Sequence, residues 1–168
     1  MTLIEHGTLI FFCGKMGAGK STLAREIALN LGAIRLSEDE WLASVFPDEI
    51  NDFADYIKYS ARLKPLLKAH VQDLLKSGVS VVMDFPANTR KQRAWFREIF
   101  SEYQLPHRLI YLEADNEVCL KRLGLRREAQ PERAKFDNED VFNQVTSYFQ
   151  PPAPDEGFNV EVVSQEHP

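Results

Sequence analysis

Residues 9–21 read Leu9-Ile10-Phe11-Phe12-Cys13-Gly14-Lys15-Met16-Gly17-Ala18-Gly19-Lys20-Ser21. An apolar run leads into a G-x-x-x-x-G-K-S loop, and the residues that follow have helical spacing. A strand, this loop and a helix, in that order, are the setting in which a backbone wraps around phosphate groups. The glycines let the chain curl so that its N–H groups point inward, and the helix N-terminus adds partial positive charge. The stretch therefore predicts a binding site for a nucleoside triphosphate.

The motif gives its residues separate roles. Lys20 is expected to reach the β- and γ-phosphates, and Ser21 is expected to supply a hydroxyl group to Mg²⁺. We accordingly expect ATP and Mg²⁺ as cofactors. The alternative is a plain glycine-rich turn between a strand and a helix. The predicted nucleotide-binding residues are Gly14, Lys15, Met16, Gly17, Ala18, Gly19, Lys20, Ser21 and Thr22.

Length and composition favour a single domain over residues 1–168. With 168 residues and 44% hydrophobic content, the chain can bury one core but is short for two ordinary domains. The formal net charge of -5 disfavours broad electrostatic adhesion to nucleic acid. Cys13 and Cys119 lack metal-type spacing, which favours two reduced, buried thiols. We see no secretory leader and no apolar run near the roughly 18 residues of a membrane span, so we expect a cytoplasmic protein without a membrane partner.

Apolar runs and helical spacing alternate along the chain. Short apolar runs predict strands at 9–12, 34–36, 79–83, 107–112 and 158–163. Helical spacing predicts helices at 20–31, 41–46, 90–103, 116–127 and 139–149, and a long one from 53 to the turn at Gly78 with a kink at Pro65. This alternation implies right-handed crossovers and a mostly parallel five-stranded sheet with helices on both faces. The predicted fold is the α/β fold of P-loop NTPases.

Carboxylates follow three of the predicted strands, among them Glu113 and Asp115 after the fourth, and binding sites in such sheets lie beyond the carboxyl ends of the strands. Asp84 follows the third strand, where it could hold Mg²⁺ beside Ser21, or simply cap the next turn. Asp39 follows the second strand and could accept the proton of an attacking hydroxyl group. Glu38 and Glu40 compete for that role. Any of the three could instead serve as an acidic first-turn residue of the next helix.

Basic residues concentrate near the end of the chain's fifth predicted helix. Because arginine can close over a γ-phosphate with two parallel hydrogen bonds, the stretch predicts a small lid at about 121–137. The alternative is a charged solvent face, and the basic start of the helix at 90–103 is also expected to be solvated. The lid sequence is Lys121-Arg122-Leu123-Gly124-Leu125-Arg126-Arg127, extended by Arg133 and Lys135.

Four motifs in a fixed order carry a resemblance to a known group. They are the phosphate loop, Ser37-Glu38-Asp39-Glu40, Asp84-x-x-x-Asn88-Thr89 and Cys119-x-x-Arg122-Leu123-x-x-Arg126. With them the chain resembles the small, AAA-ATPase-like P-loop kinases grouped with zeta toxins, chloramphenicol phosphotransferase, gluconate kinase and the kinase domain of 5′-polynucleotide kinases. The likeness implies a kinase-type P-loop fold and phosphoryl transfer from ATP to a hydroxyl group.

The resemblance also implies roles for individual residues. Asp39 takes the position of the catalytic base, and Lys20 stands at the transferring phosphate. Arg126, supported by Arg122, takes the position of lid arginines that contact the phosphates of the nucleotide. The segment 156–158 looks like the loop before the last strand, which in such kinases lies near the adenine.

The chain departs from polynucleotide kinases on the acceptor side. Those enzymes carry an arginine three residues beyond the base aspartate, where this chain has Leu42, so that contact is not carried over. Seven acidic residues between 38 and 55 would repel a polyanion. We therefore expect a neutral or cationic small hydroxyl compound as acceptor and disfavour a nucleic-acid end.

Two other functions compete with this interpretation. A 5′-polynucleotide kinase would be favoured by a continuous basic groove linking Arg90, Arg93 and the lid. A nucleotide-dependent regulatory ATPase would instead pass a conformational change to a partner.

Overall fold

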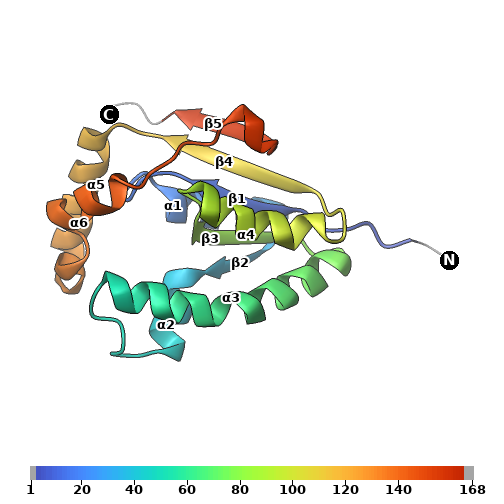
Figure 1. Ribbon diagram of the computed structural model, residues 1–168, viewed down its shortest axis with the longest axis horizontal. Coiled ribbons are helices and arrows are strands. Elements are labelled where there is room, and N and C mark those ends of the chain that lie inside the picture. Colours follow the sequence, from blue (N-terminus) through green and yellow to red (C-terminus); the bar gives the residue numbers. More distant parts are fainter. Residues whose placement is uncertain (1–2, 165–168) are drawn as a thin grey trace.

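The computed structural model describes residues 3–164, which fold around one sheet of five parallel strands (Figure 1). The strand order is β2-β3-β1-β4-β5, and every neighbouring pair is parallel. The predicted α/β fold is confirmed, and the sheet is parallel throughout. The strands are β1 (Leu9–Cys13), β2 (Ile34–Ser37), β3 (Val81–Pro86), β4 (His107–Glu113) and β5 (Val160–Ser164).

Six α-helices and two short 3-10 turns connect the strands. The helix predicted at 41–46 begins earlier, at Glu38, because the Ser37 hydroxyl accepts a hydrogen bond from the Glu40 amide and caps its first turn. The longest helix runs through Pro65 without a break and is drawn as one bowed helix in Figure 1. The helices are α1 (Lys20–Leu31), α2 (Glu38–Val45), α3 (Phe53–Lys76), α4 (Arg90–Ser101), α5 (Asn116–Ala129) and α6 (Glu139–Thr146), with the turns η1 (Pro131–Lys135) and η2 (Pro154–Glu156).

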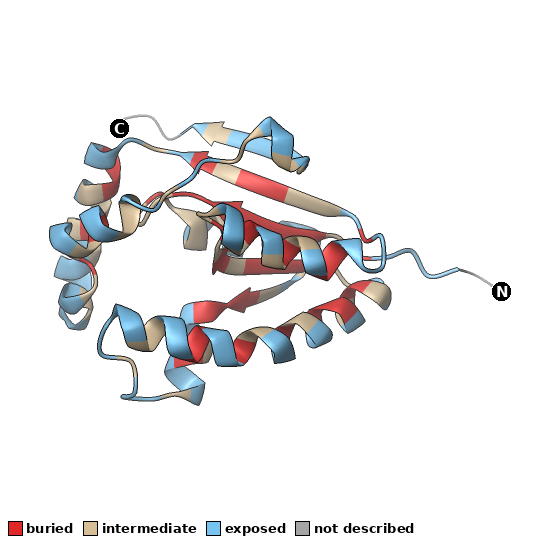
Figure 2. Ribbon diagram, viewed as in Figure 1, coloured by how far each residue is buried: buried red, intermediate tan, exposed pale blue. Residues whose placement is uncertain are grey.

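The helices cover both faces of the sheet, as the parallel topology requires. Leu9, Phe11 and Met83 pack against α3 and α4, and the Phe11 ring stacks on Phe96 with centroids 4.5 Å apart. The alternate residues of the same strands, among them Phe12, pack against α1, α5 and α6. Figure 2 shows the result: the central strands are buried, while the outer surfaces of the helices are exposed.

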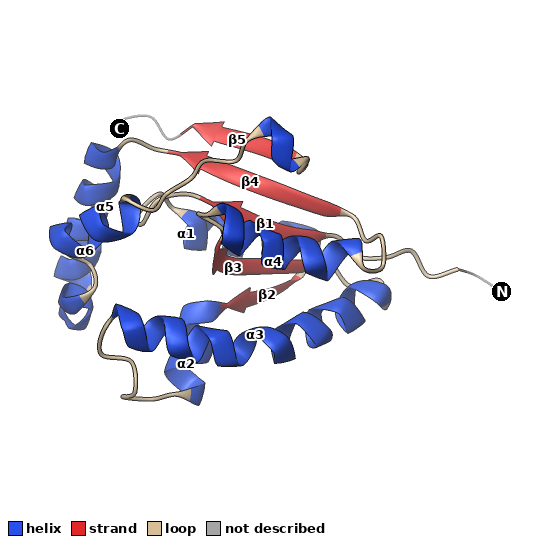
Figure 3. Ribbon diagram, viewed as in Figure 1, coloured by secondary structure: helices blue, strands red, loops and turns tan. Residues whose placement is uncertain are grey.

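The carboxyl ends of all strands point to one edge, at the left of Figure 3, where α5 and α6 also lie. The loops after β1, β2, β3 and β4 therefore meet there. Among the residues that the structure describes, no helix is long and apolar enough to cross a membrane. Cys13 and Cys119 are both buried free thiols, as expected, and burial raises the pKa of the Cys13 thiol to about 11.

Candidate phosphoryl-transfer site

The loop after β1 has the curled backbone that phosphate binding requires. Gly17 and Gly19 have φ angles of 78° and 100°, a region that side chains rarely adopt. A Cβ atom on Gly17 would also lie 2.6 Å from the Cys119 carbonyl oxygen of α5. Glycine is therefore needed at this position for two separate reasons, and α5 packs directly on the loop.

The N-terminus of α1 has no side-chain cap. Among the six α-helices of the described chain, the other five begin with a Ser, Thr, Asp or Asn side chain that accepts an amide hydrogen bond. Helix α1 begins instead at Gly19, in the left-handed conformation. Its first amide groups and its positive dipole end are thus left for an anion.

Lys20 lies across the mouth of this loop. Its Nζ atom donates hydrogen bonds to the carbonyl oxygens of Gly14, at 2.5 Å, and Lys15, at 3.2 Å. Burial lowers the pKa of Lys20, and the negative charge of Asp84 acts in the opposite direction. The ammonium group is therefore held where the phosphates of a nucleotide would lie, beside a carboxylate.

Asn88 holds the first residue of the loop, a role that sequence reasoning missed. Its Oδ1 atom accepts a 2.8 Å hydrogen bond from the Gly14 amide, and its carbonyl oxygen accepts one of 2.8 Å from the Gln150 amide. Thr89 provides the cap of α4 through the Gln92 amide. Asn88 thus ties the phosphate loop to β3 and to the segment before β5.

Asp84 lies inside β3, not after it as predicted, at an irregular point of the sheet. It pairs with Ser37 of β2, but the register between β1 and β3 shifts after Phe11, so Asp84 has no partner on β1. Such irregularities turn a side chain away from the regular pleat. The Asp84 carboxylate acts electrostatically on both Lys20 and Asp39.

The structure separates the three acidic residues that competed as base. Glu38 is 3% exposed, and its carboxylate accepts hydrogen bonds from the hydroxyl groups of Tyr56 and Ser60. Glu40 pairs with Arg35, Nη2 to Oε1 at 3.0 Å. Asp39 is open to solvent at the mouth of the site. Of the three, Asp39 alone is left to meet a substrate.

The electrostatic surroundings of Asp39 suit a proton acceptor. Protein atoms crowd its carboxylate although it remains reachable by solvent, and this desolvation raises the pKa of Asp39. Arg133, Arg126 and Lys20 lower it, and Asp84 raises it further. All of these charges converge on one carboxylate, although they come from four separate elements.

Ser21 and Asp84 fit the requirements of Mg²⁺, which is held by few protein oxygens together with phosphate oxygens. Ser21 is the second residue of α1, and Asp84 lies beside Lys20. Within residues 3–164 no group of three His, Cys, Asp or Glu side chains is placed to bind a metal ion alone. The residues present therefore suit a metal that arrives with a nucleotide.

The basic stretch predicted as a lid belongs to α5 and the turn η1. Arg122 Nη1 donates to the Ala18 carbonyl oxygen at 2.9 Å, which places it on the phosphate loop. Arg126, one turn farther, donates from Nε and Nη2 to the two oxygens of Asp137, both at 2.6 Å. Arg133 Nε also donates to Asp137, at 2.8 Å. Asp137 is 1% exposed and was not singled out from the sequence.

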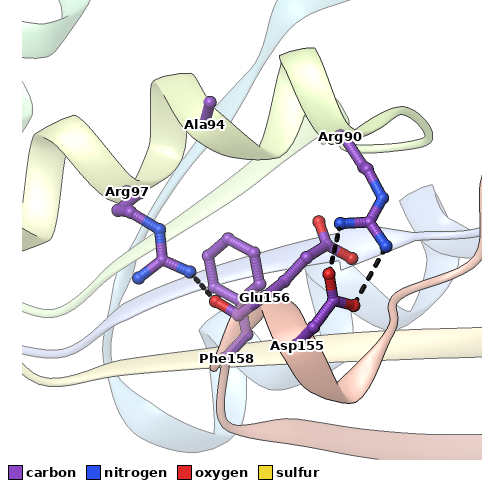
Figure 4. A pocket seen from close by; sticks show the side chains of 6 residues that line it. All are labelled: Arg90, Ala94, Arg97, Asp155, Glu156 and Phe158. Carbon is purple, nitrogen blue, oxygen red and sulfur yellow. Dashed lines mark hydrogen bonds and ion pairs between the residues drawn. The ribbon is translucent and has the colours of Figure 1, made fainter.

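The basic start of α4 is not the solvated face that its sequence predicted. Arg93 is 0% exposed and forms a two-point ion pair with Glu156, at 2.8 and 3.1 Å. Arg90 pairs with Asp155, and Arg97 donates to the Glu156 carbonyl oxygen and lies over the Phe158 ring (Figure 4). These contacts surround a cavity of about 340 Å³ lined by Arg90, Ala94, Arg97, Asp155, Glu156 and Phe158.

Two points of the sequence interpretation are decided here. The basic groove from Arg90 and Arg93 to the lid, which would have favoured a polynucleotide kinase, is not formed, because both side chains are paired with carboxylates. The segment 156–158 does not lie at the nucleotide edge, because β5 is parallel to β4 and the chain enters it at the amino ends of the strands, where the Asn159 amide donates to His107. The carboxyl end of β5 leads into 165–168, outside the described residues.

Several acidic residues of the acceptor side accept hydrogen bonds within their own region. Asp52 and Asp55 accept backbone hydrogen bonds at the start of α3, and Glu49 accepts one from a tyrosine hydroxyl group. Asp48 and Glu49 are exposed on the connection before α3. Glu40 is neutralised by Arg35, whereas hydrogen bonds from neutral groups leave the negative charge of Glu49, Asp52 and Asp55 in place.

Sequence comparison matches residues 9–152 to the protein family described as "AAA domain". The chain belongs to this AAA domain family. The AAA domain is 28% identical over 160 residues to the "Bifunctional polynucleotide phosphatase/kinase" of Schizosaccharomyces pombe, which covers 95% of this chain and 34% of that protein. The chain thus spans about a third of that relative. It is also 26% identical over 157 residues to the "Probable adenylyl-sulfate kinase" of Aeropyrum pernix, covering 89% of this chain and 80% of that protein.

A solved structure shares the fold of this AAA domain. The APS kinase of Mycobacterium tuberculosis, in complex with AMPPNP and APS, superposes with a TM-score of 0.64 at 19% identity, over 97% of this chain and 91% of that one. The AAA domain is therefore a P-loop kinase-like domain whose relatives include kinases. Membership in the narrower group of zeta toxins and chloramphenicol phosphotransferase stays a prediction.

Proposed function

We propose that this AAA domain is an ATP-dependent phosphotransferase that moves the γ-phosphoryl group of ATP to a hydroxyl group of a small molecule. The observation that carries the proposal is the meeting, at one edge, of an uncapped phosphate loop with Lys20 and a separate, solvent-reachable carboxylate, Asp39. The phosphate loop with Lys20 suits the binding of a nucleotide. The Asp39 carboxylate suits the deprotonation of an acceptor.

The chain's own residues can perform the transfer by positioning and by charge. The loop amides and Lys20 hold the triphosphate, and Asp39 accepts the proton as the acceptor oxygen bonds to the γ-phosphorus. The bond from that phosphorus to the bridging β–γ oxygen breaks, and ADP leaves. Mg²⁺, held by Ser21 and Asp84, would neutralise negative charge on the phosphates.

Substitution of Lys20 tests the proposal. Lys20→Ala should weaken ATP·Mg²⁺ binding or abolish turnover while leaving the fold intact, since it removes the cation nearest the transferring group. Calorimetric titration measures binding, and acceptor-stimulated ADP release over a panel of hydroxyl metabolites and antibiotics measures turnover. Unchanged affinity together with unchanged turnover, in a variant shown to be folded, contradicts the assignment.

The fission-yeast relative gives a 5′-polynucleotide kinase as the second candidate. Its test is phosphorylation of a short oligonucleotide with a free 5′-hydroxyl group. The two candidates differ in salt dependence, because a polyanion bound through several phosphates is released steeply by added salt. A small acceptor should show only a shallow dependence.

A further inference from the structure

Asp137 fixes two arginines in one place. Its buried carboxylate receives Arg126 from α5 and Arg133 from η1, and its backbone carbonyl oxygen receives Arg127 Nη1 at 2.9 Å. An arginine held in this way loses little further freedom when it binds a ligand. The cluster therefore presents preorganised guanidinium groups to the site.

Both arginines act on the charged groups of the site. Arg126 lies one helical turn beyond Arg122, which donates to the Ala18 carbonyl oxygen of the phosphate loop, and its charge acts on both Lys20 and Asp39. Arg133 shares the Asp137 carboxylate with Arg126, and it is the charge that acts most strongly on Asp39. Arg133 is therefore held near the carboxylate that an acceptor must approach.

Arg133 has hydrogen-bond donors that Asp137 does not use. Only its Nε atom is used by Asp137, and within residues 3–164 its two terminal nitrogens donate to no protein acceptor. Its side chain is 32% exposed, so a ligand can reach these groups. A guanidinium with two terminal nitrogens facing outward matches an oxyanion in a two-point contact.

On the basis of the proposed function, we propose that Arg133 binds an anionic group of the acceptor. The acceptor is then a hydroxyl compound that carries a carboxylate, sulfate or phosphate group near the reacting oxygen. This proposal differs from the neutral or cationic acceptor expected from the acidic residues of 38–55, because it rests on the guanidinium group of Arg133 near Asp39.

A binding experiment with inorganic sulfate tests the inference without knowledge of the acceptor. The donor site is first filled with AMPPNP·Mg²⁺, and sulfate is titrated at constant ionic strength while the arginine Nε–H resonances are followed by NMR. The wild type should bind sulfate saturably, Arg133→Ala should bind it at least tenfold more weakly, and Lys135→Ala, which removes an exposed charge from the same turn, should match the wild type.

The outcomes separate the two proposals. If AMPPNP does not bind, the proposed function fails and the inference fails with it. If AMPPNP binds but sulfate does not, or if Arg133→Ala binds sulfate as well as the wild type does, the inference alone is overturned.

A second measurement uses paired acceptors that differ by one anionic group, such as glycerol with glycerol 3-phosphate and glucose with glucose 6-phosphate. ADP release should be stimulated by anionic members of the panel only. Arg133→Ala should raise the KM for such an acceptor at least tenfold and leave the KM for ATP unchanged. Equal use of a neutral partner would overturn the inference.

Discussion

Replacement of Asp137 with asparagine removes the charge that holds the lid arginines. Three hydrogen bonds of 2.6, 2.6 and 2.8 Å reach the carboxylate. Each bond to a charged group contributes about 1.5–3 kcal/mol when buried. Arg126 and Arg133 are 36% and 32% exposed, so solvent screens part of this, and asparagine keeps one acceptor oxygen. We expect Asp137→Asn to lower the free energy of unfolding by about 2–4 kcal/mol, somewhat below the cost of breaking a fully buried ion pair.

The loss of unfolding free energy in Asp137→Asn should become smaller as the pH falls. Burial alone would raise the pKa of Asp137, but the hydrogen bonds from Arg126 and Arg133 outweigh it, and the pKa lies below its usual value. A carboxyl group with a lowered folded-state pKa stabilises the protein above its unfolded-state pKa, and this stability is lost as the pH falls through the folded-state pKa. The difference between wild type and variant should therefore shrink below about pH 3.9.

Urea unfolding of Asp137→Asn at pH 7 and pH 3 measures both effects. At pH 7 the thermal midpoint should also fall by about 5–15 °C, the shift expected for this loss in a domain of this size. Asp140→Asn is the matched control, because it removes an exposed acid from the first turn of α6 and should cost at most about 1 kcal/mol. Equal stability of the two variants at pH 7, or an undiminished loss at pH 3, would refute the reasoning.

Three further predictions concern the chemistry. Asp39→Asn should still bind ATP but lose most acceptor phosphorylation, and native activity in this variant would show that the base is elsewhere. Because burial raises the pKa of Asp39, wild-type kcat/KM should rise with pH through a pKa above the ordinary aspartate value. Asp84→Asn should raise the Mg²⁺ concentration needed for half-maximal turnover, and an unaltered Mg²⁺ titration would remove Asp84 from the metal site. Arg126→Ala should lower turnover by roughly 10³ or more with a modest change in ATP affinity, whereas Arg127→Ala should lower turnover far less. Full activity in both variants would show that the basic stretch is an ordinary solvent-exposed surface.

The sheet could be predicted from sequence because buried parallel strands are continuous apolar runs. The errors lie at the strand ends: β3 and β5 each begin two residues later than predicted, and polar residues extend β3 beyond its apolar run. Asp84 ends the apolar run at 79–83, yet β3 continues to Pro86 because Asp84 pairs with Ser37 of β2. Such an extension depends on a neighbouring strand that is distant in sequence, and local pattern does not contain it.

The phosphate loop could be predicted from the sequence because its chemistry fixes the spacing of its residues. The residues that support the site could not be predicted in this way. Asp137 sits in a polar, proline-containing stretch, where a carboxylate normally faces water, and it is buried only because two arginines fold over it. The burial of Arg93, by contrast, could have been predicted from the sequence. It lies three residues before Phe96 and six before Ile99, on the buried side of α4, so helical spacing could have marked it as a core arginine in need of a carboxylate partner.

The central position of β1 has a consequence for how the protein is made. Leu9 pairs with Val81 on one side and with His107 on the other, so β1, which precedes the other four strands of the sheet in the chain, is flanked on both sides only after β4 has been synthesised. At elongation rates of about 5–20 residues per second, roughly 5–20 s pass before both neighbours exist. The apolar residues of β1 gain one neighbour with β3 and the other with β4, and Asn88, which anchors the loop, follows directly after β3. The nascent chain should therefore acquire nucleotide affinity only late in synthesis, after β3 and Asn88 have emerged.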